Sequence, residues 1–229
     1  MAGQLLFLHW RAARWAMLPF VVAAFGLPLL MVQGLGGTPA AVGGADWLAF
    51  GFLETAIRWS PFFPLLAAIT GTVLALTAWS WDHGADHVYA LSLPLARWRY
   101  AGLKFGTGAL LSLLPVAALG IGALLAVSAV SVPVGMNAYP GALTLRFLAA
   151  TLTAYGFLFA LASGTIRSTV ILISVVLGVL LLGDPLLEAL SNFVPGLAGV
   201  RFAPWVVETL SSWPSPLQIF TDNWFLFDV

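Results

Sequence analysis

Charged residues are so sparse in this chain that five long stretches contain none. Asp, Glu, Lys and Arg make up 8% of the 229 residues, whereas soluble domains carry about 25%. The charge-free intervals are 15–45, 59–81, 105–145, 147–166 and 168–183. A charge at the centre of a bilayer costs about 2.5–3.5 kcal/mol, so charged residues delimit the segments that can cross it. The pattern excludes a water-soluble fold and predicts an all-α integral membrane protein.

The intervals accommodate about five transmembrane helices. We expect spans near 15–33, 59–81 and 105–130, followed by a tight helical hairpin of 147–166 and 168–183 around Arg167. A helix needs about 20 apolar residues to cross a bilayer. The fifth interval is slightly short, at 16 residues, and we still count it as a span.

The two ends of the chain differ from these spans. In residues 1–14, basic and polar residues alternate with Leu and Trp, which predicts an N-terminal interfacial helix with His9 at the membrane surface. Residues 184–229 contain six charges and five prolines, and their longest uncharged run cannot span a bilayer. We expect an extramembrane or interfacial C-terminal tail whose tryptophans, Trp205, Trp213 and Trp224, lie at the headgroups.

The basic residues predict the orientation. With a cytoplasmic N-terminus, the inner segments carry Arg11, Arg14, Arg97, Arg99, Lys104 and Arg167, and the outer segments carry Arg58, Arg146 and Arg201. Basic residues favour the cytoplasmic side. We therefore expect a protein of the cell (plasma or inner) membrane, with its N-terminus inside and its C-terminal tail outside.

The most polar segment is the predicted inner loop between the second and third spans, residues 82–104. If residues 85–93 are helical, two acidic and two histidine residues repeat at i,i+4 on one side, and Val88 and Leu91 lie on another. Pro94 should end this helix. An amphipathic cytoplasmic helix followed by basic residues indicates a docking surface for a partner. Its candidate residues are Asp82, His83, Asp86, His87, Val88, Leu91, Arg97 and Arg99.

Two other interpretations of the loop remain open, a divalent-metal site at His83 and His87 and an ordinary solvated loop. Against a metal site, Gly84 interrupts the ligand helix, and no metalloprotease Glu follows the first histidine. The chain has no cysteine and none of the Walker, HExxH or GxSxG motifs, so we expect no enzymatic activity and no cofactor. Its net charge of zero gives no indication of nucleic-acid binding.

Polar residues within the spans are few. Thr70, Thr72 and Thr77 in the second span either support close helix packing or line a pathway across the membrane. The near absence of ionisable residues argues against a proton relay or an ion-coupled transporter.

The inner loop resembles a known family. Ser92-Leu-Pro-Leu-Ala-Arg97, then Tyr100-Ala-Gly-Leu-Lys104 and a long apolar helix, is similar to the type-2 ATP-binding-cassette exporter permeases. The resemblance covers residues 1–183 in layout, and it implies a transmembrane permease domain there, followed by the extracytoplasmic tail 184–229. It further implies a coupling helix in the loop 82–104, a separate cytoplasmic ATPase, and a second permease copy or related subunit that completes the pathway.

An alternative function is a non-transporting structural or anchoring subunit of a larger membrane complex. The permease family usually has six spans, whereas this sequence provides five. The scarcity of polar residues within the spans also favours this alternative. The identity of the cytoplasmic partner would distinguish the two hypotheses.

Overall fold

The structure is a computed structural model of the full chain. It describes residues 2–33, 45–84, 96–132, 135–164, 166–191, 201, 204–205, 208–209, 212, 215–221 and 224–228. These residues divide into two compact units, Met1–Phe159 with Asp222–Val229, and Ala160–Thr221.

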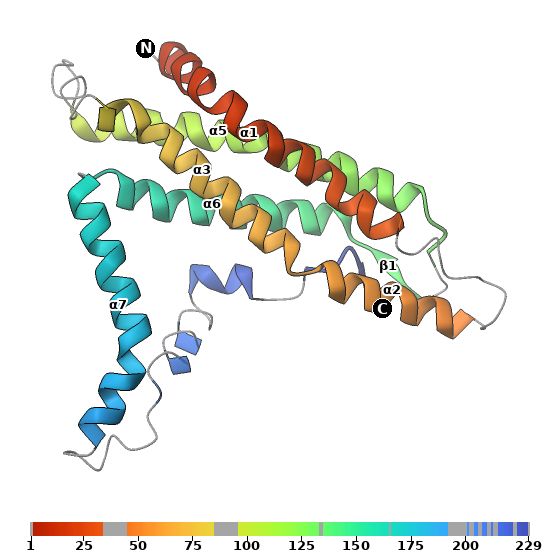
Figure 1. Ribbon diagram of the computed structural model, residues 1–229. Coiled ribbons are helices and arrows are strands. Elements are labelled where there is room, and N and C mark those ends of the chain that lie inside the picture. The colour runs from red at the N-terminus through yellow and green to blue at the C-terminus, as the bar shows by residue number, and fades with distance from the viewer. Residues whose placement is uncertain are drawn as a thin grey trace. The chain divides into compact units, whose positions relative to one another are not determined.

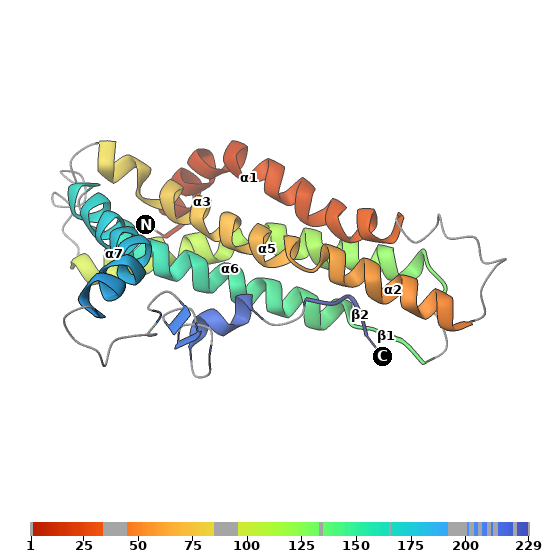
Figure 2. The same ribbon diagram turned by 60° about the horizontal axis from the view of Figure 1, so that its bottom comes forward.

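Four long helices run side by side in the first unit (Figures 1 and 2). They are α1 (Ala2–Gln33), α3 (Phe62–Gly84), α5 (Arg97–Ser128) and α6 (Pro140–Ala162), the last of which ends just beyond the unit's boundary. A shorter helix, α2 (Ala45–Trp59), precedes α3 almost end to end. The break between them lies at Ser60 and Pro61, because proline has no backbone N–H with which to continue a helix.

Glycines allow the helices to approach closely. A Cβ added at Gly122 of α5 would collide with the backbone carbonyl of Phe25 in α1. A Cβ at Gly71 of α3 would lie 2.6 Å from the carbonyl oxygen of Thr151 in α6. Small residues at such crossings allow the backbones of membrane helices to come into contact. Because these two residues have no side chain, α1 can contact α5 at Gly122 and α3 can contact α6 at Gly71.

Among the residues that the structure describes, four stretches are long and apolar enough to cross a membrane, namely His9–Gln33, Phe50–Ser80, Trp98–Ser128 and Pro140–Ala162. Large apolar side chains are exposed along all of them, for example Val22, Ile69, Leu110 and Phe157. Such faces are suited to contact with lipid or with other apolar helices. This confirms the prediction of a mostly helical protein with helices able to span a membrane.

The N-terminal interfacial helix is not confirmed. Residues 2–33 form one continuous helix, with no break between the leader and the first span. His9, expected at the membrane surface, is 6% exposed. His9 is enclosed by protein beside Thr107 of α5, and the position of the leader at the membrane surface remains a prediction.

The second unit contains α7 (Ile166–Ser191). It is a 26-residue helix that continues through Asp184 and Pro185, beyond the charge-free interval. Among the residues described after Ser191, the longest element is the five-residue 3₁₀ helix η2 (Pro216–Phe220). A fifth span in α7 and an outer tail remain predictions.

The chain returns to the first unit at its C-terminus. Strand β1 (Asn137–Ala138), between α5 and α6, pairs with β2 (Phe227–Asp228) in an antiparallel register. The pairing continues where Tyr139 N–H donates to the Leu226 carbonyl at 2.8 Å. This short sheet places the C-terminal residues at the opposite end of the unit from the start of α1, as Figure 1 shows.

Candidate functional site

The predicted docking loop connects α3 to α5 at the end of the unit where α1 begins. Residues 85–95 lie outside the described part of the chain, and with them Asp86, His87, Val88 and Leu91. Asp82 and His83 belong to the last turn of α3. Arg97 begins α5, after Ala96 in extended conformation. The structure therefore defines both ends of the loop, and the role of its residues remains a prediction.

An exposed pair lies directly after the loop. Trp98 is 72% exposed, and the guanidinium carbon of Arg99 lies 5.2 Å from the centre of its ring. A cation over an indole face at this distance is favourable even in solvent. This pair presents one charge and one apolar ring beside the loop, where a docked protein or a headgroup can contact both.

The three threonines of the predicted pathway all bond within their own helix. Thr70 donates to the Leu66 carbonyl at 2.6 Å. Thr72 and Thr77 make equivalent bonds to Ala68 and Leu74. Thr70 is buried, and the other two are half-buried. Each hydroxyl proton is already bonded, so these groups can offer a passing molecule only acceptor lone pairs.

No group of three or more His, Cys, Asp or Glu residues that could hold a metal ion occurs among the described residues. The structure describes neither the side chain of His83 nor any part of His87. The metal interpretation of the loop is therefore not tested by it.

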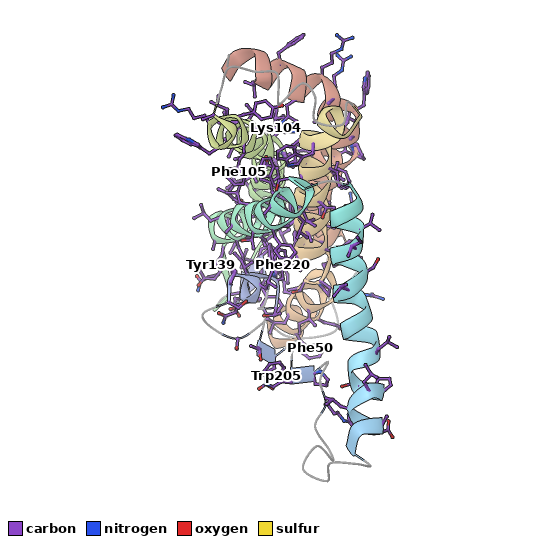
Figure 3. The ribbon with its side chains drawn as sticks, turned by 90° about the vertical axis from the view of Figure 1, so that its left-hand side faces the viewer. Phe50, Lys104, Phe105, Tyr139, Trp205 and Phe220 are labelled. Carbon is purple, nitrogen blue, oxygen red and sulfur yellow. The ribbon has the colours of Figure 1, made fainter. Side chains whose placement is uncertain are left out.

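The structure reveals a buried polar site that the sequence analysis missed. We call it the Lys104 cluster: His9 of α1, Trp79 of α3, Tyr100, Lys104 and Thr107 of α5, and Tyr155 of α6. All six residues are at most 7% exposed. They bring together four helices at the end of the unit from which the predicted docking loop leaves. Figure 3 shows Lys104 and Phe105 among these helix ends.

Lys104 lies at the centre of the cluster. Its ammonium nitrogen is 4.3 Å from the ring centre of Trp79 and 5.2 Å from that of Tyr100. The same nitrogen donates a long hydrogen bond of 3.5 Å to the Tyr100 hydroxyl. Burying an ammonium is costly without compensation. The two electron-rich ring faces supply part of that compensation and connect α5 to α3.

The backbone of the same turn connects α5 to α1. Thr107 donates its hydroxyl proton to the Lys104 carbonyl at 2.8 Å. Its oxygen lies 3.2 Å from His9 Nδ1. Because the hydroxyl has one proton, already directed at the carbonyl, Thr107 accepts this bond and Nδ1 carries the hydrogen.

Two further bonds attach α6. The Tyr155 hydroxyl donates to the Phe105 carbonyl at 3.2 Å, and its ring stacks on Phe105 at 5.0 Å. Trp79 Nε1–H donates to the Phe159 carbonyl at 3.2 Å. The Phe159 carbonyl lies in the last turn of α6, where the Ser163 N–H bonds to Ala160 instead.

A second site missed by the sequence analysis is the C-terminal segment 224–228, which we call the C-terminal clasp. Trp224 N–H donates to the Ser60 hydroxyl at the break between α2 and α3, at 3.2 Å. The guanidinium carbon of Arg146 lies 5.0 Å from the Trp224 ring centre. Phe227 meets Phe52 edge-to-face at 5.3 Å. Trp224 is 2% exposed, so the expectation that it lies at the headgroups was wrong.

No protein-family model, curated protein or solved structure matches this chain.

Proposed function

We propose that the chain is the transmembrane subunit of an ABC-type exporter. It forms part of the translocation pathway in the cell membrane and docks a separate cytoplasmic ATPase through the inner loop 82–104. A second copy or a related subunit completes the pathway. ATP is hydrolysed on the partner, and this chain contributes no catalytic group.

The observation that carries the proposal is the context of the loop. A short polar segment containing Ser92-Leu-Pro-Leu-Ala-Arg97 joins two helices, α3 and α5, that are each apolar enough to span a membrane. The family that this sequence resembles uses the same position for its coupling helix. The exposed Trp98 and Arg99 extend the contact surface along the first turn of α5.

In this function the loop transmits force and the helices guide the substrate. Closure of the partner ATPases around nucleotide would displace the loop, and the helices attached to it would open a path between permease halves. The apolar stripe of Val88 and Leu91 would occupy a groove on the ATPase. Burying two such side chains contributes roughly 3–6 kcal/mol before ordering costs.

Co-purification tests the proposal. The double variant Val88→Asp, Leu91→Asp should insert into membranes normally and lose the ATPase subunit, because each new carboxylate must be desolvated in the groove. A matched control is Tyr89→Asp, Ala90→Asp, which adds the same charge on the opposite side of the predicted helix. Retention of the ATPase by the Val88/Leu91 variant, or its equal loss from both variants, would contradict docking through this stripe.

A structural or anchoring subunit remains the second candidate, and one observation favours it. The hydroxyls of Thr70, Thr72 and Thr77, and likewise those of Ser112 and Thr144, all donate to carbonyls of their own helices. Helices whose hydroxyl protons are bonded internally can pack against other apolar helices without leaving a donor unsatisfied. A purified complex that contains no ATPase with a Walker motif would favour this candidate.

A further inference from the structure

The Lys104 cluster lies near the two helix ends that a displacement of the loop 85–95 would move first. Trp79 is five residues before the end of α3 at Gly84, and Tyr100 and Lys104 lie in the first turns of α5. The loop joins these same two helix ends. The ammonium over the Trp79 ring therefore bridges the two points to which the loop is attached.

We propose that Lys104 is the positioning residue that makes α1 and α6 follow a displacement of the loop. The inference rests on the proposed function, since it assigns the route by which the docked ATPase acts on the helices. The side chain of Lys104 contacts α3 through the Trp79 ring. Its backbone carbonyl is linked to α1 through Thr107 and to α6 through the Tyr155 hydroxyl.

Distances show how little freedom the bridge allows. A cation is held by a ring within about 6 Å of its centre, and the ammonium of Lys104 is at 4.3 Å from that of Trp79. Movement of the ammonium by about 2 Å directly away from the ring would take it out of this range. The helix ends therefore move together, or the bridge to α3 breaks and the buried ammonium loses the Trp79 ring.

The route onward runs through the same turn of α5. The Lys104 carbonyl accepts the Thr107 hydroxyl, which in turn accepts from His9 of α1. The Tyr155 hydroxyl of α6 lies 3.4 Å from the Lys104 carbonyl and 3.2 Å from that of Phe105. A tilt of this turn changes both carbonyl positions, so it acts on α1 and α6 at once.

An exposed cation–π pair on α1 provides a matched control. The guanidinium carbon of Arg14 lies 5.5 Å from the ring centre of Trp15. Both residues are exposed, and they are neighbours on one helix, so their pair joins no helices. Removing the Arg14 charge should leave the response of α1 unchanged.

The experiment uses the complex of the full chain with its ATPase in lipid nanodiscs. The chain lacks cysteine, so a single thiol at Phe7, 62% exposed on α1, reports on this helix alone. Its labelling rate by a water-soluble maleimide is measured without nucleotide and with a non-hydrolysable ATP analogue. We expect the analogue to change the rate in the otherwise native chain and in Arg14→Met.

In Lys104→Met the ATPase should remain bound at native stoichiometry, and the nucleotide-dependent change in labelling should be lost. Lys104→Arg keeps a cation over the ring and should restore the change, which a purely structural role of the side chain would not predict. If Lys104→Met purifies poorly, Trp79→Leu removes the same bridge from the α3 side and should give the same loss.

Three results overturn the inference. The first is a native nucleotide response in Lys104→Met, and the second is loss of the ATPase from this variant, which would make Lys104 a docking residue. The third is an unchanged labelling rate in the native chain. Absence of any ATPase from the native complex refutes the proposed function and this inference together, and it is detected before any variant is made.

Discussion

Gly71 provides a direct test of the helix packing. A Cβ at this position of α3 would lie 2.6 Å from the Thr151 carbonyl oxygen, 2.7 Å from the Tyr155 nitrogen and 2.8 Å from the Ala154 Cβ, all on α6. Two of these three atoms belong to the backbone and cannot rotate away. We predict that Gly71→Ala destabilises the protein, although alanine is the better helix former.

The magnitude follows from the overlap. Ordinary contact begins at 3.4 Å, which exceeds the closest approach of 2.6 Å by 0.8 Å, so α3 and α6 must separate by about that distance. Overpacking of this kind costs about 1–3 kcal/mol, and exchanging glycine for alanine in a helix returns roughly 0.5–1 kcal/mol. The net loss is therefore between about 0 and 2.5 kcal/mol, and its midpoint of roughly 1 kcal/mol lowers the ratio of folded to unfolded protein by a factor of about 5.

Unfolding by SDS titration in mixed micelles, followed by tryptophan fluorescence, measures this difference. Gly26→Ala is the matched control, because Gly26 lies inside α1 and a Cβ there would have no heavy atom within 4 Å. The control should be neutral or slightly stabilising. If Gly71→Ala proved as stable as Gly26→Ala, the close contact of α3 with α6 would be wrong.

Two further predictions concern the ends of the chain. A membrane-impermeant maleimide added to intact cells should label Ser191→Cys and not Ser92→Cys, since the distribution of basic residues predicts an N-terminus inside the cell. The reverse labelling pattern would invert the predicted topology and place the loop on the side opposite the ATPase. Trp224→Ala should open the C-terminal clasp, because truncating a buried tryptophan costs about 3–5 kcal/mol, which a two-residue ladder, the Tyr139–Leu226 bond and the Phe52–Phe227 contact must then offset. Leu226 is fully buried in the native chain, so a cysteine at this position should react rapidly with maleimide only in the Trp224→Ala variant. The control Trp205→Ala changes an exposed position and should leave this cysteine protected. Unchanged protection in Trp224→Ala would contradict the clasp.

The sequence was sufficient to locate the long helices because the underlying effect is local. An uncharged run long enough to cross a bilayer is visible in the sequence wherever it occurs, and each of the five intervals overlaps a helix of the structure, although most of these helices extend past the charged residues at the interval ends. Helix α2 was not predicted. It carries Asp46, Glu54 and Arg58 within 15 residues, so no charge-free run of spanning length indicates it.

Neither buried site could be predicted from the sequence, because each depends on which helices are neighbours. His9 and Thr107 are 98 residues apart, and Ser60 and Trp224 are 164 residues apart. Glycines that permit close approach occur throughout the chain, 23 in all, so composition does not select the pairs of helices that meet. The one signal available was Lys104, an ionisable residue beside the third span, which entered the prediction of orientation and the family resemblance but not the prediction of a buried site.

The two buried sites contact opposite ends of α3. At one end Trp79 binds the Phe159 carbonyl of α6 and faces the Lys104 ammonium. At the other end Ser60 accepts the backbone N–H of Trp224 in the C-terminal clasp. A hydrogen-bonded helix transmits axial displacement with little compression, because each turn is closed by its own backbone bonds. In the proposed exporter, a push on the loop would therefore move α3 as a rod and reach the break at Ser60 and the clasp. A displaced α3 would then either carry the clasp with it or break the bond between Ser60 and Trp224.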